Sequence, residues 1–340
     1  MRARAWMKGK GTGVLTVSLL LSLLSWPAQS ASANNTTFSG EATVVQATVL
    51  GLPPVVLSDT GALDSTGGAR EASLLDASVP GLLTAEVLHA STVGQGQRSS
   101  SEASVANVTL TVGGNTISAG LLRARATAEC HNGTASVSGS SEIVDLVVNG
   151  QAIVVSGQPN QTISLPVGRV IINEQQSSVS GNTGDITVNA LHVMVDGVAD
   201  VIISSAHADI TCGGPVCPGG DFVTGGGWIT GTPSGEKGTF GVAGGIKNGR
   251  LWGHLTYIDH GTNMKVKGTG VTAYTVTGPT TRHIEGTAEI NGRSGFTYQV
   301  DVSDNGEPGR KDMFSITLSD GYSASGLLIG GNIQLHQPCK

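Results

Sequence analysis

The stretch "NVTLTVGGN" at residues 107–115 decides the fold class of this chain. Its apolar side chains at 108, 110 and 112 alternate with polar ones at 107, 109 and 111. A period of two is typical of a strand with one buried face. The Gly-Gly-Asn that follows supplies the positive φ angles that tight hairpin turns require. The stretch therefore predicts one arm and the turn of an antiparallel hairpin.

The same signals recur along the chain. Apolar residues alternate again over 296–302 and 314–318, and the segment 144–155 is typical of strand, Asn149-Gly150 turn and strand. Asn-Gly pairs also lie at 132–133, 248–249, 291–292 and 305–306. With 50 glycines, the composition favours an all-β protein made of antiparallel sandwich or barrel-like modules. The apolar spacing of 70–77 and 81–90 is mixed and predicts a turn or two of helix, and Ser99–Ser101 predicts a surface loop.

Residues 1–33 have the features of a cleaved secretory signal. Arg2, Arg4, Lys8 and Lys10 precede an apolar run at 14–24, and Ala31-Ser32-Ala33 is a small-x-small cleavage site. The alternative, an uncleaved anchor, is disfavoured because the run is short for a bilayer. No later segment is apolar for about 18 residues, so we expect a soluble, secreted chain that starts at Asn34 and carries no membrane anchor.

Composition divides the rest of the chain into two modules. Residues 34–216 contain one aromatic residue and residues 217–340 contain ten. The first segment has no lysine, and its 5 arginines against 15 acids give a net charge of −10. We predict a β domain over 34–212, a Gly/Pro spacer over 213–216 and an aromatic-rich β module over 217–340. An acidic, lysine-free module argues against nucleic acid and anionic membranes as partners.

Four cysteines, Cys130, Cys212, Cys217 and Cys339, follow the signal, and in an exported chain they predict disulfides. We favour Cys130–Cys212 with Cys217–Cys339, so that each module is closed by its own bond. The crossed pairing and a local Cys212–Cys217 bond remain open. A zinc site is disfavoured because no Cys-x-x-Cys is present.

Long stretches of both modules resemble known sequences. Residues 36–212 resemble the choice-of-anchor P family of bacterial surface and secreted proteins through "ATVVQATVLGL", "ATAECHNGTA", "LPVGRVIINEQ" and "ITVNALHVMVDGVADVIISSAHADITC". Residues 217–339 resemble the module that commonly trails that domain through "CPGGDFVTGGGWI", "GTFGVAGGIKNGRLWGHLTYIDH", "INGRSGFTYQVDVSDNGEPGRKDMFSI" and "GNIQLHQPC". The resemblance implies an extracellular all-β protein with no established catalytic activity. The C-terminal surface anchor for which the family is named is not matched here.

Two groups of residues are candidates for binding. The acidic loop "DVSDNGEPGRKD" at 301–312 offers Asp301, Asp304 and Asp312 as oxygen ligands for calcium, and no other cofactor is expected. Trp228 and Trp252 could stack on sugar rings. On the strand predicted at 251–258, Leu251, Leu255 and Tyr257 form the expected core face, which would leave Trp252 exposed. The alternatives are a solvated acidic turn and aromatic rings that only fill a core.

Three other groups of residues are weaker candidates for a catalytic or metal site. Ser205, His207 and Asp209 share one strand face, but residues two apart lie roughly 6.5–7 Å from each other, too far for a catalytic relay. A metal site at His254, Asp259 and His260 would need a turn, because neighbours on a strand point to opposite faces. Glu285 and Glu289 are too far apart along a strand to act as a glycosidase pair.

We therefore expect no catalytic residues and no enzymatic activity. The favoured hypothesis is a secreted, disulfide-stabilised structural or interaction protein of the bacterial exterior. Its expected partner is a cell-envelope polysaccharide or protein. The alternatives are a carbohydrate-binding or adhesin module and, less favoured, an extracellular hydrolase.

Overall fold

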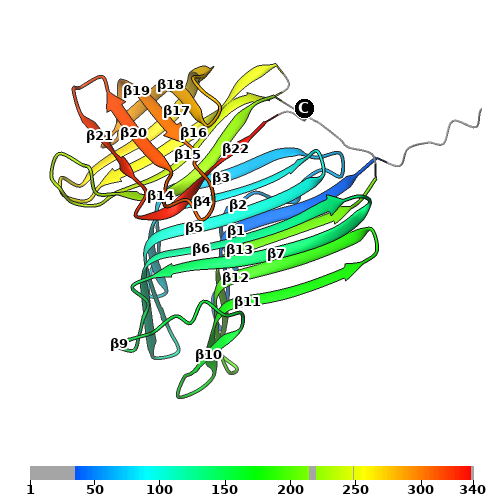
Figure 1. The fold of residues 1–340 in the computed structure, drawn as a ribbon. Coiled ribbons are helices and arrows are strands. Elements are labelled where there is room, and N and C mark those ends of the chain that lie inside the picture. Colours follow the sequence, from blue (N-terminus) through cyan, green and yellow to red (C-terminus); the bar gives the residue numbers. More distant parts are fainter. Residues whose placement is uncertain (1–34, 214–219, 248, 338–340) are drawn as a thin grey trace, which may run out of the picture. The chain divides into compact units, whose positions relative to one another are not determined.

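The computed structural model describes residues 35–213, 220–247 and 249–337, and none of these residues is helical. Their strands form three antiparallel sheets, as the sequence predicts (Figure 1). The first sheet has the order β10-β11-β12-β13-β1-β2, and the second has the order β3-β4-β5-β6-β8-β9 with β7 also paired to β6. The third sheet has the order β21-β20-β19-β18-β17-β16-β15-β14-β22.

The strands of the first sheet are β1 (Thr37–Val49), β2 (Val55–Asp59), β10 (Gln161–Ser164), β11 (Arg169–Ser180), β12 (Thr183–Val195) and β13 (Ala199–Thr211). Those of the second are β3 (Gly68–Val79), β4 (Leu83–Gln95), β5 (Arg98–Val112), β6 (Asn115–His131), β7 (Thr134–Val144), β8 (Val147–Val148) and β9 (Gln151–Ala152). Those of the third are β14 (Phe222–Ile229), β15 (Gly238–Lys247), β16 (Arg250–Asp259), β17 (Met264–Val276), β18 (Thr281–Ile290), β19 (Arg293–Ser303), β20 (Met313–Leu318), β21 (Ser323–Leu327) and β22 (Gly330–His336).

The hairpin signals place the turns correctly. Val108, Leu110 and Val112 are buried on β5, and Gly113 and Gly114 turn the chain into β6 with φ of 55° and 76°. Asn149 and Gly150 likewise have positive φ between β8 and β9. The left-handed conformation at these turns is the one that Asn and Gly adopt most readily. The 107–115 stretch and the 149–150 turn are thus confirmed.

The apolar residues form two main cores. One lies between the first and second sheets and is made of Val, Leu, Ile and Ala with a single aromatic ring, Phe38. The other lies within the third sheet and contains Phe240, Tyr257, Tyr298 and Phe314. The uneven distribution of aromatic residues along the sequence therefore reflects two cores packed with side chains of different size.

The middle of the second sheet, on β4, β5 and β6, is buried on both faces, and two expectations are wrong here. Residues 70–77 lie in β3 and residues 83–90 in β4, with 81–82 in the turn between them, so the expected helix is not formed, and Ser99–Ser101 lie buried in β5, not in a surface loop. One face packs on the first sheet, while Val87, Ala106, Ala69 and Val93 on the other face contact the third sheet. A strand buried on both sides loses its polar alternation, and a β-bulge between Glu86 and His89 shifts the period further.

A disulfide joins Cys130, at the end of β6, to Cys212, directly after β13, with Cα atoms 5.6 Å apart. It links the second sheet to the first, as the favoured pairing requires. Cys217 and Cys339, the signal segment and residues 214–216 of the spacer lie outside the described residues, so what the sequence indicates for them stays a prediction. In the described part of the chain, no helix is long and apolar enough to cross a membrane.

Candidate functional site

The two tryptophans proposed as sugar-stacking residues are half-buried. Trp252 packs against Phe222, with ring centroids 5.7 Å apart, and against the second-sheet residues Ala69 and Val93. Lys237 Nζ lies 4.9 Å from the centre of the Trp228 ring. Both indole nitrogens are buried and make no hydrogen bond to any described residue. Since the Trp252 ring contacts the second sheet, it does not have the exposure expected from the sequence, and sugar stacking at either ring stays a prediction.

The three aspartates proposed for calcium bind different partners. Asp301 Oδ1 lies 2.7 Å from His283 Nδ1. Asp304 accepts hydrogen bonds from the backbone N–H groups of Gly306 and Leu335. Asp312 is fully buried and accepts the N–H groups of Asn305 and Ile333 at 2.8 and 2.9 Å, and burial raises its pKa to about 6. Within the described residues these carboxylates do not converge as a set of three ligands.

The histidine-containing constellations are also separated. His207 Nε2 lies 2.9 Å from Asp185 on the neighbouring strand, rather than from Asp209. Asp259 accepts hydrogen bonds from Ser234 and Tyr322, whereas His260 contacts Thr239 on β15. His254 therefore does not meet Asp259 and His260 at a common point.

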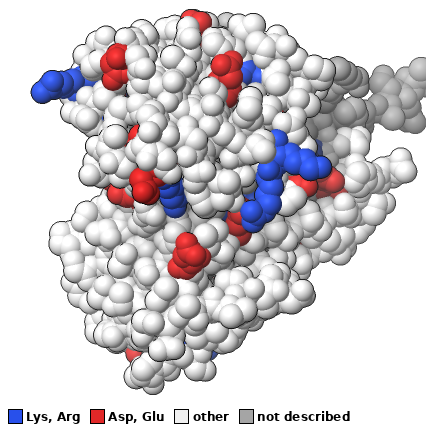
Figure 2. All heavy atoms as spheres, turned by 60° about the vertical axis from the view of Figure 1, so that its left-hand side comes forward, with Lys and Arg blue, Asp and Glu red and all other residues white. Residues whose placement is uncertain are grey.

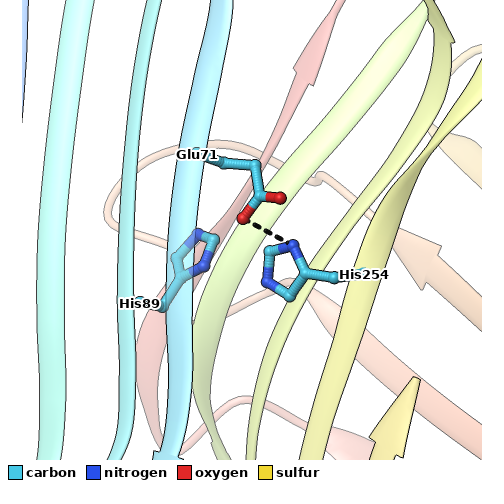
Figure 3. Close-up of side chains that lie close together, drawn as sticks. All are labelled: Glu71, His89 and His254. Carbon is cyan, nitrogen blue, oxygen red and sulfur yellow. Dashed lines mark ion pairs between the residues drawn. The ribbon is translucent and has the colours of Figure 1, made fainter. Parts of the chain in front are cut away.

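His254 instead meets two residues of the second sheet. Figure 3 shows Glu71 from β3, His89 from β4 and His254 from β16 pointing toward one another, and their ligand atoms all lie within 4.8 Å. Glu71 pairs with Ser91 and His89 with Ser73, so both project from the same face of the β3–β4 ladder. His254 shares its face of β16 with Trp252, the face that contacts the second sheet.

His89 is buried, whereas Glu71 and His254 are half-buried. His89 is 1% exposed, and neither of its ring nitrogens has a hydrogen-bond partner in the part of the chain that the structure describes. His254 Nδ1 lies 2.6 Å from Glu71 Oε2, yet neither atom makes a hydrogen bond of acceptable geometry. Burial lowers the pKa of His89 to about 3, and the nearby His254 acts in the same direction. Burial raises the pKa of Glu71, but the contact with His254 outweighs it and leaves that pKa lowered.

A second feature is a cavity of about 280 Å³ where the second sheet meets the loop before β20. Three of the five arginines of the first module line it, namely Arg98, Arg123 and Arg125, together with Thr127, Ser138, Gly139, Ser140, Glu307 and Pro308. Arg123 and Arg125 of β6 alternate with Ala124 and Ala126, which belong to the core between the first and second sheets. The pattern "RARA" at 123–126, in a segment without lysine, was the available sequence signal for this cluster.

Each arginine of the cavity already has a carboxylate partner. Arg123 contacts Glu102 and Glu142 at 3.2 and 3.0 Å. Arg125 is paired with Glu307, and Arg98 lies 3.4 Å from Glu129. Among the described residues, one buried N–H group of each of the two β6 arginines nevertheless has no hydrogen-bond partner: Arg123 Nε and Arg125 Nη2. The cavity is therefore nearly neutral in charge but has unused hydrogen-bond donors.

On the face seen in Figure 2, charged groups are sparse and lie among uncharged atoms, with red and blue groups close together at several points. This mixture agrees with the neutral balance of the third-sheet segment, whose 10 acids match 10 cations over residues 217–340. On this face, contacts between individual charged side chains therefore matter more for binding than the summed electrostatic field of the protein.

No protein-family model matches the chain, and no curated protein matches it. A solved crystal structure described as a putative AttH from Nitrosomonas europaea aligns with 89% of this chain and 93% of its own chain, at 7% identity and a TM-score of 0.20. A likeness at this level carries no argument about fold or activity. The resemblance to the choice-of-anchor P family stays a prediction.

Proposed function

We propose that the chain is a secreted, non-catalytic interaction protein of the bacterial exterior that binds an oxygen-rich cell-envelope polysaccharide. The observation that supports this most is the arginine-lined cavity, where two buried N–H groups, Arg123 Nε and Arg125 Nη2, have no partner among the described residues and the hydroxyls of Thr127, Ser138 and Ser140 also line the wall. Buried donors without partners are energetically unfavourable until an acceptor reaches them. Sugar hydroxyl and carboxylate oxygens are such acceptors.

The charge balance of the cavity favours this ligand class. Glu102, Glu142 and Glu307 already neutralise Arg123 and Arg125, so an isolated multivalent anion would gain little net attraction. A ligand that accepts several directed hydrogen bonds gains more. A cavity of about 280 Å³ is at the small end for ligand pockets, which fits one unit of a polymer.

The same residues hold the two halves of the chain together. Arg125 pairs with Glu307 of the third-sheet segment, and Glu142 accepts the backbone N–H of Gly331 at 3.1 Å. Elsewhere Lys265 Nζ lies 2.6 Å from Asp76, and Lys237 Nζ donates to the Gly120 carbonyl. These contacts favour a rigid, preorganised cavity, which suits binding without turnover.

Affinity electrophoresis in gels that contain polysaccharide from the producing cell's envelope tests the proposal. We expect the wild-type chain to be retarded and Arg125→Gln to bind at least about tenfold more weakly, since a tenfold change corresponds to the ~1.4 kcal/mol of one strong hydrogen bond. Arg169→Gln is the matched control, because Arg169 is exposed and lies outside the cavity.

Three results would contradict the proposal: no retardation of the wild type, equal retardation of Arg125→Gln, or release of reducing ends from the polysaccharide. Thermal melts of both variants show whether they are folded. Arg125→Gln leaves only the half-exposed Glu307 unpaired, so the fold should tolerate it.

A further inference from the structure

We propose that Glu71, His89 and His254 form a binding site for one transition-metal dication of the zinc type, which bridges the second and third sheets. The site is separate from the arginine-lined cavity, with which it shares no residue. The proposal depends on the convergence of two imidazoles and one carboxylate from three strands, and on the absence of hydrogen-bond partners for their ligand atoms.

The distances suit metal coordination. Zinc bonds to nitrogen and carboxylate oxygen of about 2.0–2.1 Å place tetrahedral ligands roughly 3.3 Å apart. The ligand atoms of the trio lie within 4.8 Å of one another, and the closest pair, His254 Nδ1 and Glu71 Oε2, is 2.6 Å apart. Small side-chain rotations therefore bring three ligands to a common centre, and a water molecule can complete the fourth position.

The unused ring nitrogens point to a ligand rather than to a packed core histidine. A buried imidazole normally donates or accepts at least one hydrogen bond. His89 makes none, although it lies beside Ser104 on the β4–β5 ladder.

The surroundings favour an imidazole-binding metal over calcium or magnesium. Calcium takes six to eight oxygen ligands, and the trio offers one carboxylate. The Lys247 ammonium also acts on Glu71 and binds the Ala69 carbonyl, so net negative charge does not hold the cation. Coordination by nitrogen must supply the affinity, and zinc, copper, nickel and cobalt bind imidazole well.

The packing leaves room for the His89 ring. Gly226 of β14 and Gly241 of β15 are cross-strand partners. A Cβ at Gly226 would come within 3.6 Å of the ring, and a Cβ at Gly241 would come within 3.3 Å of His89 Cβ. The third sheet thus has no side chains at the two positions where His89 approaches it.

Zinc titration of the purified, tag-free, chelator-treated full chain tests the proposal, with a chromophoric chelator as competitor. We expect one zinc ion per chain. His254→Gln and Glu71→Gln should each weaken binding at least about 100-fold, the upper end of what loss of an outer-shell partner causes. His283→Gln is the matched control, because it removes a histidine that contacts two carboxylates, Asp301 and Glu285, outside the trio.

A second measurement does not depend on variants. Cobalt added to the wild-type chain should give the visible absorption of a low-symmetry site with nitrogen ligands, and zinc should abolish it. Zinc should also raise the melting temperature of the wild type and of His283→Gln, but not of His254→Gln. The proposal is overturned if the wild type binds no stoichiometric zinc or cobalt, or if folded His254→Gln and Glu71→Gln bind zinc as tightly as the wild type.

Discussion

His336 lies at the end of β22, where its ring stacks on Phe222 with centroids 4.5 Å apart. Its Nε2 is 3.0 Å from Thr224 Oγ1. Burial lowers the pKa of His336 to about 3, and the nearby Arg98 and Arg125 act in the same direction. The folded chain therefore holds this imidazole neutral, whereas the unfolded chain protonates it near pH 6.5.

The expected consequence is acid destabilisation. Between about pH 6.5 and 3 the unfolded state binds more protons at His336 than the folded state, so stability rises with pH and is lost as pH falls. In this window, a fall of one pH unit lowers the free energy of unfolding by up to ~1.4 kcal/mol. In urea denaturation at pH 4 to 7, His336→Gln should make the free energy of unfolding less dependent on pH, by up to ~1.4 kcal/mol per pH unit. An unchanged pH dependence would show that His336 is protonated in the folded chain.

His254 and Trp252 show what a period of two can and cannot predict. The alternation correctly separated Leu255 and Tyr257, which are buried in the third-sheet core, from Trp252 and His254. Leu251, which was expected on the same core face, is instead 42% exposed near the start of β16. The alternation could not show whether the second face meets water or another sheet. A face of mixed polarity suits both situations, so the exposure expected for Trp252 was wrong.

At the scale of strands, β14 and β15 bring the second and third sheets close together through glycine. A Cβ at Gly226 would lie 2.8 Å from Ser104 Oγ. Hairpin turns can be predicted from the sequence because Asn-Gly pairs are local signals. The approach of β14 to β4 and β5 joins residues more than a hundred positions apart, and no local pattern encodes it. The Glu71–His89–His254 trio was missed for the same reason.

Gly226→Ala should therefore destabilise the fold by about 1–3 kcal/mol, the usual range for overpacking. Gly270→Ala on β17 is the matched control, because its Cβ would meet only Thr287 Oγ1 at an ordinary 3.5 Å. Chemical denaturation of both variants measures the difference. Equal stabilities would mean that the sheets can separate at β14 without loss.

For the whole molecule, the Cys130–Cys212 bond closes a loop with a sequence separation of 82. In the chain-entropy model, a disulfide that closes such a loop raises the free energy of unfolding by about 4–5 kcal/mol, and measured values are often lower. The double variant Cys130→Ser/Cys212→Ser should lower the free energy of unfolding by about 2–4 kcal/mol. Calorimetry of the oxidised wild type and the variant tests this, and equal melting temperatures would contradict it.

The other expected bond, Cys217–Cys339, stays a prediction, because both cysteines lie outside the described residues. Phe222 on β14 and His336 on β22 are direct partners, and Cys217 and Cys339 lie five residues before and three residues after them in sequence. Peptide mapping without reduction should recover Cys130 with Cys212 and Cys217 with Cys339. A peptide that links Cys212 to Cys217 would overturn both pairings.

The order of the third sheet also bears on how the protein is made. Strand β22 is the last described strand to be synthesised, yet it pairs with β14, the first strand of that sheet. Until β22 arrives, β14 presents an unpaired row of backbone donors and acceptors to any neighbouring chain. A chain that stops before residue 330 therefore keeps an adhesive edge, by which proteases and chaperones can recognise an unfinished copy.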